Sequence, residues 1–467
     1  MNAIRRGLVA ALIVAMGLLA VPAASWAVPS FARQTGFSCA SCHTIYPELT
    51  PLGRRFKLQG YVLTTTPTQG DESDYVLNKV PPVSAMVQAS ISQTDKDQPD
   101  TAAGSGTAQN ATVRLPQQLS LFYAGRISPN TGAFIQITYN PTDDHFSIDN
   151  TDIRLVDSGS LGQSQLAYGL TLNNNPTVQD LWNSTPAWGF PYASPPQGLP
   201  APSAAPLLSG GLAQQVAGLG GYAALLQSDG MVYAELSAYR SNQTGSPLPL
   251  DSTAQQPVVQ DTAPYLRVAY EHNAGPASWE VGALSLSAAL LQEPTTTAAS
   301  VNSDGTTKAA VTGTGLSQTF ANNFSDTGID TQIQFFPSDE NIFSIKGLAL
   351  HEDQAWNAQV GNEHNSTSLD SLQVTGSYYF RRMVGVNLQY FTLSGTRDAV
   401  LYAANRTNKP DSAGTTVELV YNPWLNTRYS LQYTMYDTFN GASSNYSGAG
   451  RNASDNNTLY LLAWWMF

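Results

Sequence analysis

Residues 427–436 of the chain read TRYSLQYTMY, and large apolar side chains occupy every second position of this stretch. Residues 131–140, TGAFIQITYN, show the same alternation of apolar and polar side chains. Successive side chains of a β-strand point to opposite faces, so both stretches predict strands with one apolar and one polar face. A soluble β-sandwich and a membrane β-barrel both use such strands, so alternation alone leaves the two folds open.

Comparable stretches recur over residues 80–467 and predict sixteen strands, an even number as in single-chain bacterial outer-membrane barrels. Their approximate ranges are 80–94, 115–127, 131–141, 146–158, 162–173, 217–228, 230–241, 263–273, 277–292, 325–337, 341–354, 368–381, 383–395, 413–424, 426–439 and 457–467. Short turns alternate with long connections such as 174–216, 242–262 and 293–324, although 141–145 is shorter than this scheme expects. Such barrels have their short turns on the periplasmic side and their long loops outside.

The chain ends in LLAWWMF, residues 461–467, an aromatic strand that finishes on phenylalanine. This ending resembles the insertion signal at the C-terminus of outer-membrane barrels. Further aromatic rings lie near predicted strand ends, where they favour the membrane interface; they are Tyr378, Tyr379, Phe380, Tyr421 and Trp424. We therefore expect a mainly β fold, a 16-stranded antiparallel β-barrel in contact with outer-membrane lipid.

The N-terminus predicts a secretory signal peptide over residues 1–27. Arg5 and Arg6 precede the apolar run 8–21, and Ser25-Trp26-Ala27 offers a small-residue cleavage site. This run is shorter than the roughly 20 residues that cross a bilayer, so a membrane helix is the weaker interpretation. The net charge of −12 becomes more negative once the leader is removed, which disfavours nucleic acid as a partner.

The 467 residues include only two cysteines, both in the run Cys39-Ala40-Ser41-Cys42-His43. Two thiols at this spacing can add to the two vinyl groups of one haem, and the histidine then becomes the proximal iron ligand. A disulfide at this spacing would be strained, a redox dithiol suits the cytosol, and zinc needs about four ligands. We predict one covalent haem c held by Cys39, Cys42 and His43.

The motif lies in a short segment, residues 28–79, that differs from the strands after it. Helical spacing of Leu49, Leu52 and Phe56 predicts a helix within 47–61. A segment this small rarely buries enough surface alone, so the barrel of residues 80–467 is expected to enclose it. The haem should then face the periplasmic side or the barrel lumen.

The sequence leaves the distal haem ligand open. Met86 is a candidate because it follows the haem segment closely and shares inward parity with Gln88 and Ser90. The other candidates are His145, His272, His351, His364, Met383 and Met435. The sequence also leaves open an unoccupied sixth position or a ligand outside this set. Five further residues face inward and suit either a porin constriction or a polar haem support: Arg126, Asp152, Arg154, Arg267 and Glu271.

Residues 29–43, PSFARQTGFSCASCH, and 46–54, YPELTPLGR, resemble the fused cytochrome-porins of iron-oxidising bacteria. Residues 172–182 and 185–190 also resemble that family, whereas the remaining barrel matches it only in architecture. The resemblance implies a monohaem domain at the periplasmic side of a 16-stranded barrel that takes electrons from extracellular Fe(II).

The expected activity is that of an iron(II):cytochrome oxidoreductase that passes electrons to a periplasmic cytochrome or cupredoxin. Two alternatives remain: a conduit for another extracellular donor or acceptor, and a diffusion porin in which haem acts as plug or sensor. Fe(II) accepts oxygen and nitrogen ligands, so weak guidance at the outer loops is expected from residues such as Asp180, Glu352, Asp353 or His364.

Overall fold

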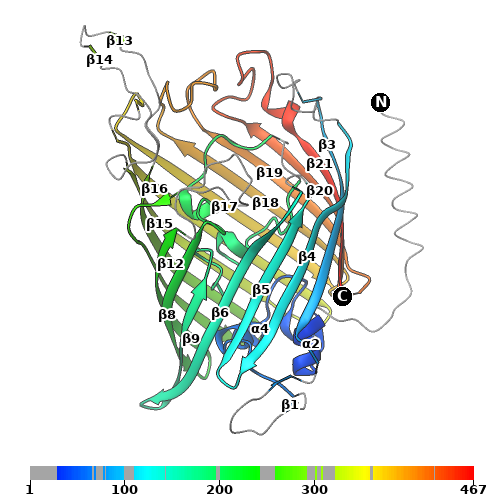
Figure 1. The fold of residues 1–467 in the computed structure, drawn as a ribbon. Helices are drawn as coiled ribbons and strands as arrows, with labels where there is room; N and C mark the ends of the chain where they lie inside the picture. Colours follow the sequence, from blue (N-terminus) through cyan, green and yellow to red (C-terminus); the bar gives the residue numbers. More distant parts are fainter. Residues whose placement is uncertain are drawn as a thin grey trace.

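The computed structural model describes residues 29–65, 68–69, 77–78, 80–98, 110–141, 144–195, 200–241, 258–291, 300–301, 307–308, 321–357, 361–424 and 426–467. The signal peptide predicted over 1–27 lies outside these residues. The described chain forms a closed antiparallel barrel around short N-terminal helices (Figure 1). No helix in these ranges is long and apolar enough to cross a membrane.

Sixteen long strands build the wall. The first eight are β3 (Val83–Thr94), β4 (Thr112–Ser128), β5 (Thr131–Asn140), β6 (His145–Leu161), β7 (Ser164–Asn173), β8 (Val216–Gln227), β9 (Gly230–Ser241) and β11 (Ala263–Ala274). The second eight are β12 (Ala277–Leu291), β15 (Ala321–Phe335), β16 (Asn341–Ala355), β17 (Ser366–Phe380), β18 (Val384–Gly395), β19 (Ser412–Tyr421), β20 (Thr427–Thr438) and β21 (Thr458–Met466). Every predicted strand is present, with ends displaced by a few residues, so the predicted fold class is confirmed.

Closure depends on the pairing of the last strand with the first. β21 runs antiparallel to β3 from Thr458 opposite Thr94 to Met466 opposite Met86. Phe467 extends this seam through two backbone hydrogen bonds with Ala85. The short strand β10 (Val258–Val259) pairs with β12 beyond the start of β11. Two further pairs are made of two-residue strands. They are β1 (Thr68–Gln69) with β2 (Leu77–Asn78), and β13 (Ser300–Val301) with β14 (Thr307–Lys308).

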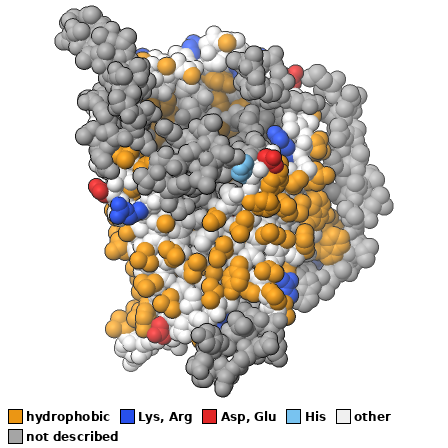
Figure 2. All heavy atoms as spheres, viewed as in Figure 1, with side chains coloured by type: hydrophobic (Ala, Val, Ile, Leu, Met, Phe, Trp, Pro, Cys, Tyr) orange, Lys and Arg blue, Asp and Glu red, His pale blue; other side chains and the backbone are white. Residues whose placement is uncertain are grey.

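The two faces of the wall differ as the alternation predicts. In β16, Ser344 and Lys346 point inward and are buried, whereas Phe343 and Ile345 point outward and are exposed. Figure 2 shows hydrophobic side chains spread over the outer wall, with the few charged side chains of this face near its margins. An exposed apolar band on a closed wall is the mark of a membrane barrel and excludes a soluble sandwich.

The two rims also differ. Short turns join β4 to β5, β6 to β7 and β8 to β9 at the rim where helix α2 and the C-terminus lie (Figure 1). By the rule for such barrels this is the periplasmic rim. The connection between β7 and β8, expected as an external loop, instead turns into the lumen, where residues 175–185 are buried.

Three short helices occupy the periplasmic end of the lumen: α2 (Pro29–Thr35), α3 (Cys39–Cys42) and α4 (Pro51–Leu58). The helix predicted within 47–61 is α4. Thr50 caps it, since its side chain accepts a hydrogen bond from the Gly53 amide at 3.2 Å, and Pro51 has the fixed φ suited to a first turn. Short 3-10 helices occur later: η1 (Pro186–Trp188), η2 (Leu207–Ser209) and η3 (Ala453–Asn456).

Deleting residues 464–467 should open the barrel seam, because it removes the pairing with Met86, Val87 and Gln88 together with the Phe467 bonds to Ala85. The full-length protein should migrate differently on a detergent gel before and after heating, and the deletion should lose this difference and reach the outer membrane poorly. Deleting the exposed outer residues 448–450 is the matched control and should change neither property. A heat-modifiable barrel without residues 464–467 would contradict the role of the seam.

Candidate functional site

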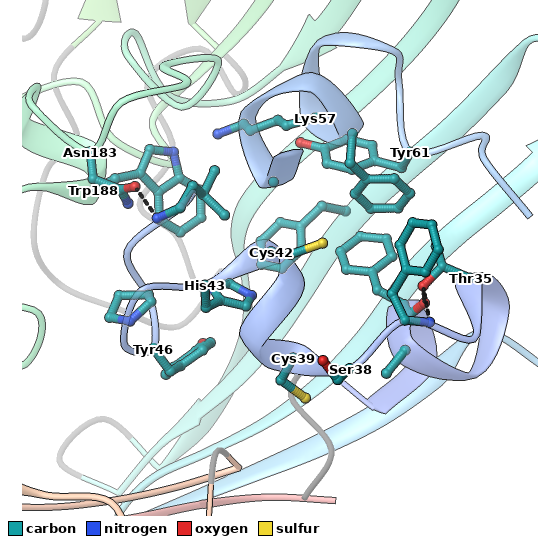
Figure 3. A pocket seen from close by; sticks show the side chains of 18 residues that line it. Thr35, Ser38, Cys39, Cys42, His43, Tyr46, Lys57, Tyr61, Asn183 and Trp188 are labelled. Carbon is teal, nitrogen blue, oxygen red and sulfur yellow. Dashed lines mark hydrogen bonds between the residues drawn. The ribbon is translucent and has the colours of Figure 1, made fainter. Parts of the chain in front are cut away.

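A cavity at the periplasmic end of the lumen is lined by all three predicted haem-attachment residues (Figure 3). It contains about 860 Å³ not filled by protein atoms, including open solvent at its mouth. Cys39 and Cys42 lie on the single turn of α3, neither of them in a disulfide, and His43 follows directly. Seven of the other lining residues are aromatic: Phe31, Phe37, Tyr46, Phe56, Tyr61, Phe134 and Trp188. A largely apolar cavity with a few polar groups suits a flat, mostly apolar cofactor.

The Cys-x-x-Cys turn is held against α4 by the main chain. The Cys42 carbonyl oxygen accepts a hydrogen bond from the Thr50 amide at 2.9 Å, and the Thr50 hydroxyl donates to the Ser41 carbonyl at 2.6 Å. A Cβ atom at Gly53 would lie 2.2 Å from the Cys42 carbonyl oxygen. Only glycine therefore permits this approach, which brings α4 to the wall of the cavity.

His43 has the arrangement expected of an iron ligand. Its Nδ1 atom lies 3.2 Å from the Glu48 carbonyl oxygen, which assigns the ring proton to Nδ1 and leaves the Nε2 lone pair available. Burial lowers the pKa of His43 to about 4, although the carbonyl groups of Glu48 and Pro47 oppose the shift. The imidazole is therefore neutral near pH 7, and Cys39, Cys42 and His43 together fit a covalently attached haem.

None of the seven proposed distal ligands is among the described residues that line the cavity. Met86 points inward as predicted and is 2% exposed, but it packs against Phe122, Tyr460 and Trp464 instead. The histidines are elsewhere: His272 pairs with Asp229 and His351 with Asp370, while His145 and His364 lie at the outer ends of strands or beyond them. Met383 and Met435 also lie away from the cavity wall. Besides His43, three described lining residues have nitrogen in their side chains: Lys57, Asn183 and Trp188.

Two buried charges fix the haem segment to the barrel. The Glu48 carboxylate lies 3.1 Å from the Lys346 ammonium on β16. On α4, Arg54 Nε lies 2.8 Å from the Glu271 carboxylate on β11. The guanidinium of Arg54 also donates to Ser278 at 2.6 Å and to Gln334 at 2.8 Å, on two further strands.

The inward connection between β7 and β8 closes the cavity from above the helices. Lys57 donates to the carbonyl oxygens of Val178 and Asp180, each at 2.7 Å, and its ammonium lies 4.6 Å from the centre of the Trp188 ring. The Asn183 side chain accepts a hydrogen bond from the Leu49 amide at 3.1 Å. The connection and the haem segment therefore form one packed unit inside the barrel.

The inward charges predicted from parity support this unit. Arg154 donates to the Lys57 carbonyl at 3.1 Å and pairs with Asp152 at 2.8 Å. Arg267 pairs with Asp180 of the connection at 2.6 Å, and Glu271 holds Arg54 as described above. Arg126 lies near the periplasmic rim, where its backbone amide donates to Gln34 of α2 at 2.7 Å. Through these contacts the inward charges hold the N-terminal segment and the inward connection in the lumen.

Two of the residues expected to guide iron at outer loops are placed differently. Asp180 is 3% exposed, because its carboxylate binds Arg267 and the amides of Trp182, Ser184 and Thr185. Glu352 is 1% exposed and accepts from the Leu207 amide inside the lumen. Neither is available at the surface, since both belong to the packing of the inward connection. Asp353 and His364 remain exposed.

Sequence reasoning missed Lys57, Asn183 and Trp188 as lining residues. For Asn183 and Trp188 a signal was present, because residues 181–216 contain no charged side chain, as suits a segment inside the lumen.

The fold and the site define an outer-membrane β-barrel of porin size whose lumen holds a Cys-x-x-Cys-His segment. No protein-family model matches the sequence, and no match was found among curated proteins. Among solved structures, it is similar to OmpT of Vibrio cholerae with loop L8 deleted, at 10% identity and a TM-score of 0.44 over 82% of this chain and 98% of that one. The chain is also similar to the outer-membrane channel DcaP of Acinetobacter baumannii, at 13% identity and a TM-score of 0.43 over 82% of this chain and 96% of that one. It is similar as well to an anion-selective porin from Comamonas acidovorans, at 14% identity and a TM-score of 0.43 over 82% of this chain and 98% of that one.

Changing Arg54 to Ala should loosen α4, because it leaves the buried Glu271 carboxylate without its cationic partner, at a cost of about 3–5 kcal/mol. Amide hydrogens of α4 should then lose protection from exchange by about 100-fold or more. The measurement is hydrogen–deuterium exchange in detergent. Arg55 is half-exposed on the same helix, so Arg55→Ala should leave the exchange rates nearly unchanged, and equal effects of the two variants would contradict the clamp.

Proposed function

We propose that this protein is an outer-membrane electron conduit that oxidises extracellular Fe(II) and delivers the electron to a periplasmic carrier through one covalent haem. The observation that carries the proposal is the cavity itself: Cys39, Cys42 and a correctly hydrogen-bonded His43 line one aromatic pocket inside a membrane barrel. The similarity of residues 29–54 to cytochrome-porins of iron-oxidising bacteria supports Fe(II) as the donor.

A bound haem supplies a one-electron iron couple at the periplasmic end of the lumen. In the net reaction each Fe(II) outside loses one electron and becomes Fe(III), and a periplasmic cytochrome or cupredoxin gains that electron. No bond is made or broken in the protein, so no nucleophile or acid–base pair is needed. When haem is bound, Cys39 and Cys42 would hold it through thioether bonds, His43 would bind its iron, and the aromatic walls would exclude water from it.

Placement inside a barrel solves a chemical problem of iron oxidation. Ferric iron precipitates near neutral pH, so a cell benefits from leaving the product outside and importing only the electron. The inward connection favours this arrangement, because residues 175–185 are buried across the lumen next to the haem segment. Lys57 and Trp188 join the two parts directly.

A diffusion porin with haem as plug or sensor is the second candidate. The size of the wall favours it, since barrels of about 16–18 strands can leave an aqueous channel. The buried Arg54, Lys57 and Trp182 inside the lumen favour the conduit instead, because they fill space that solutes would cross. A conduit for another extracellular donor or acceptor would use the same cavity.

Purified wild-type protein should carry covalent haem that Fe(II) reduces in a stopped-flow experiment. The double change Cys39→Ser and Cys42→Ser should abolish haem staining on a denaturing gel while the barrel remains heat-modifiable. His43→Ala should retain the stain but alter the haem spectrum, since the thioethers do not replace the axial nitrogen. Unstained wild-type protein would refute the haem proposal. Haem that dithionite reduces but Fe(II) does not would indicate another donor, and solute flux through vesicles would favour the porin.

The haem potential should depend on pH through Lys57. Burial, reinforced by repulsion from Arg154, lowers the pKa of Lys57 to about 7. Below that pH the charged ammonium favours reduced iron, so the midpoint potential should be higher at pH 6 than at pH 8 and fall as pH rises through about 7.

Lys57→Met should flatten this dependence in a spectroelectrochemical titration. Lys96→Met, which changes an exposed lysine at the outer rim, is the matched control and should keep the wild-type slope. An unchanged slope in Lys57→Met would show that Lys57 does not titrate beside the haem.

A further inference from the structure

Glu48 is an unusual residue for a loop next to a proposed haem ligand, because its carboxylate is fully buried and tied to the barrel at several points. It is 0% exposed and accepts hydrogen bonds from Tyr192 at 2.5 Å and Tyr379 at 2.9 Å. Lys346 lies 3.1 Å away as its ion partner. Thr44 and Ser344 add longer contacts at 3.4 Å.

These partners come from three parts of the chain. Lys346 and Tyr379 belong to the neighbouring wall strands β16 and β17, and Tyr192 belongs to the inward connection. Lys346 also donates to the Tyr192 hydroxyl at 2.8 Å, so the anchor is a connected network. Such a network holds a side chain far more rigidly than a single bond.

The main chain of the same residue reaches His43. The Glu48 carbonyl oxygen is the acceptor for His43 Nδ1 at 3.2 Å, and it also accepts from the Thr44 amide at 3.1 Å. The Glu48 amide donates to Ile45 at 2.7 Å, which closes the loop on itself. Movement of the carboxylate anchor would therefore move the acceptor that orients the imidazole ring.

We propose that Glu48 is a positioning residue that fixes the orientation of His43 from the barrel wall and thereby sets part of the reduction potential of the bound haem. This inference rests on the proposed function, since it requires His43 to bind haem iron. A hydrogen bond from His43 Nδ1–H to a fixed carbonyl oxygen makes the imidazole a stronger electron donor. A stronger donor favours the oxidised iron. Loss of the anchor should weaken this bond and raise the potential.

Substitutions that remove no charge can separate the positioning of His43 by Glu48 from the electrostatic effect of the Glu48 carboxylate on the haem. The double variant Tyr192→Phe with Tyr379→Phe removes two hydroxyl donors to Glu48 and leaves its ion pair with Lys346 in place. Tyr265→Phe is the matched control, because Tyr265 is 1% exposed on the inner wall and its hydroxyl has no hydrogen-bond partner among the described residues. The readouts are the midpoint potential and the ferric electron paramagnetic resonance spectrum of purified holoprotein.

The double variant should show a higher midpoint potential and shifted ferric g-values, with Tyr192→Phe alone giving a smaller change in the same direction and Tyr265→Phe giving none. If the double variant does not assemble, the single Tyr192→Phe variant decides, because it leaves every barrel strand unchanged. Haem-loaded variants with the wild-type potential and g-values would overturn the role of Glu48 while leaving the conduit proposal intact. Wild-type protein without covalent haem would instead refute the proposed function.

Discussion

A charge buried inside the barrel must be paired, and this requirement fixes the N-terminal helical segment to the wall. Breaking a buried pair leaves an uncompensated charge at a cost of about 3–5 kcal/mol, so Glu48 stays with Lys346 and Arg54 stays with Glu271. Both pairs join a short N-terminal segment to strands more than two hundred positions away in the sequence. A segment too small to build its own core thus obtains one from the lumen of the barrel.

The need to pair buried charges also explains why the connection between β7 and β8 turns into the lumen. Asp180 pairs with Arg267, and its other oxygen accepts backbone amides of the connection, so this chain turns inward and covers the helices. Its uncharged remainder then meets the aromatic wall of the cavity through Trp188. The result is an apolar pocket with three groups suited to haem, separated from the outer rim by protein. Such enclosure is one of the means by which a protein tunes a haem.

Local sequence patterns were sufficient for the fold and for the attachment motif. Alternation and turn residues located every wall strand, and the spacing of Cys39, Cys42 and His43 is itself local. Contacts between distant residues were not accessible in the same way. Parity gave the inward direction of Met86 but not its neighbours in space, so Met86 packs beside Trp464 in a cluster next to the cavity and is not one of the lining residues. Asp180 was expected at the surface because its partner, Arg267, is 87 positions away.

In the proposed function, electrons cross the membrane through this barrel while iron stays outside. The direct measurement uses proteoliposomes that carry the protein in the wall and a soluble ferric cytochrome c inside, with Fe(II) added outside. The enclosed cytochrome should be reduced at a rate proportional to the amount of protein that carries covalent haem, and no iron should be found inside the vesicles. Absence of reduction, or equal reduction with the Cys39→Ser and Cys42→Ser variant, would contradict it, because Fe(II) would then be excluded or would simply leak through the pore.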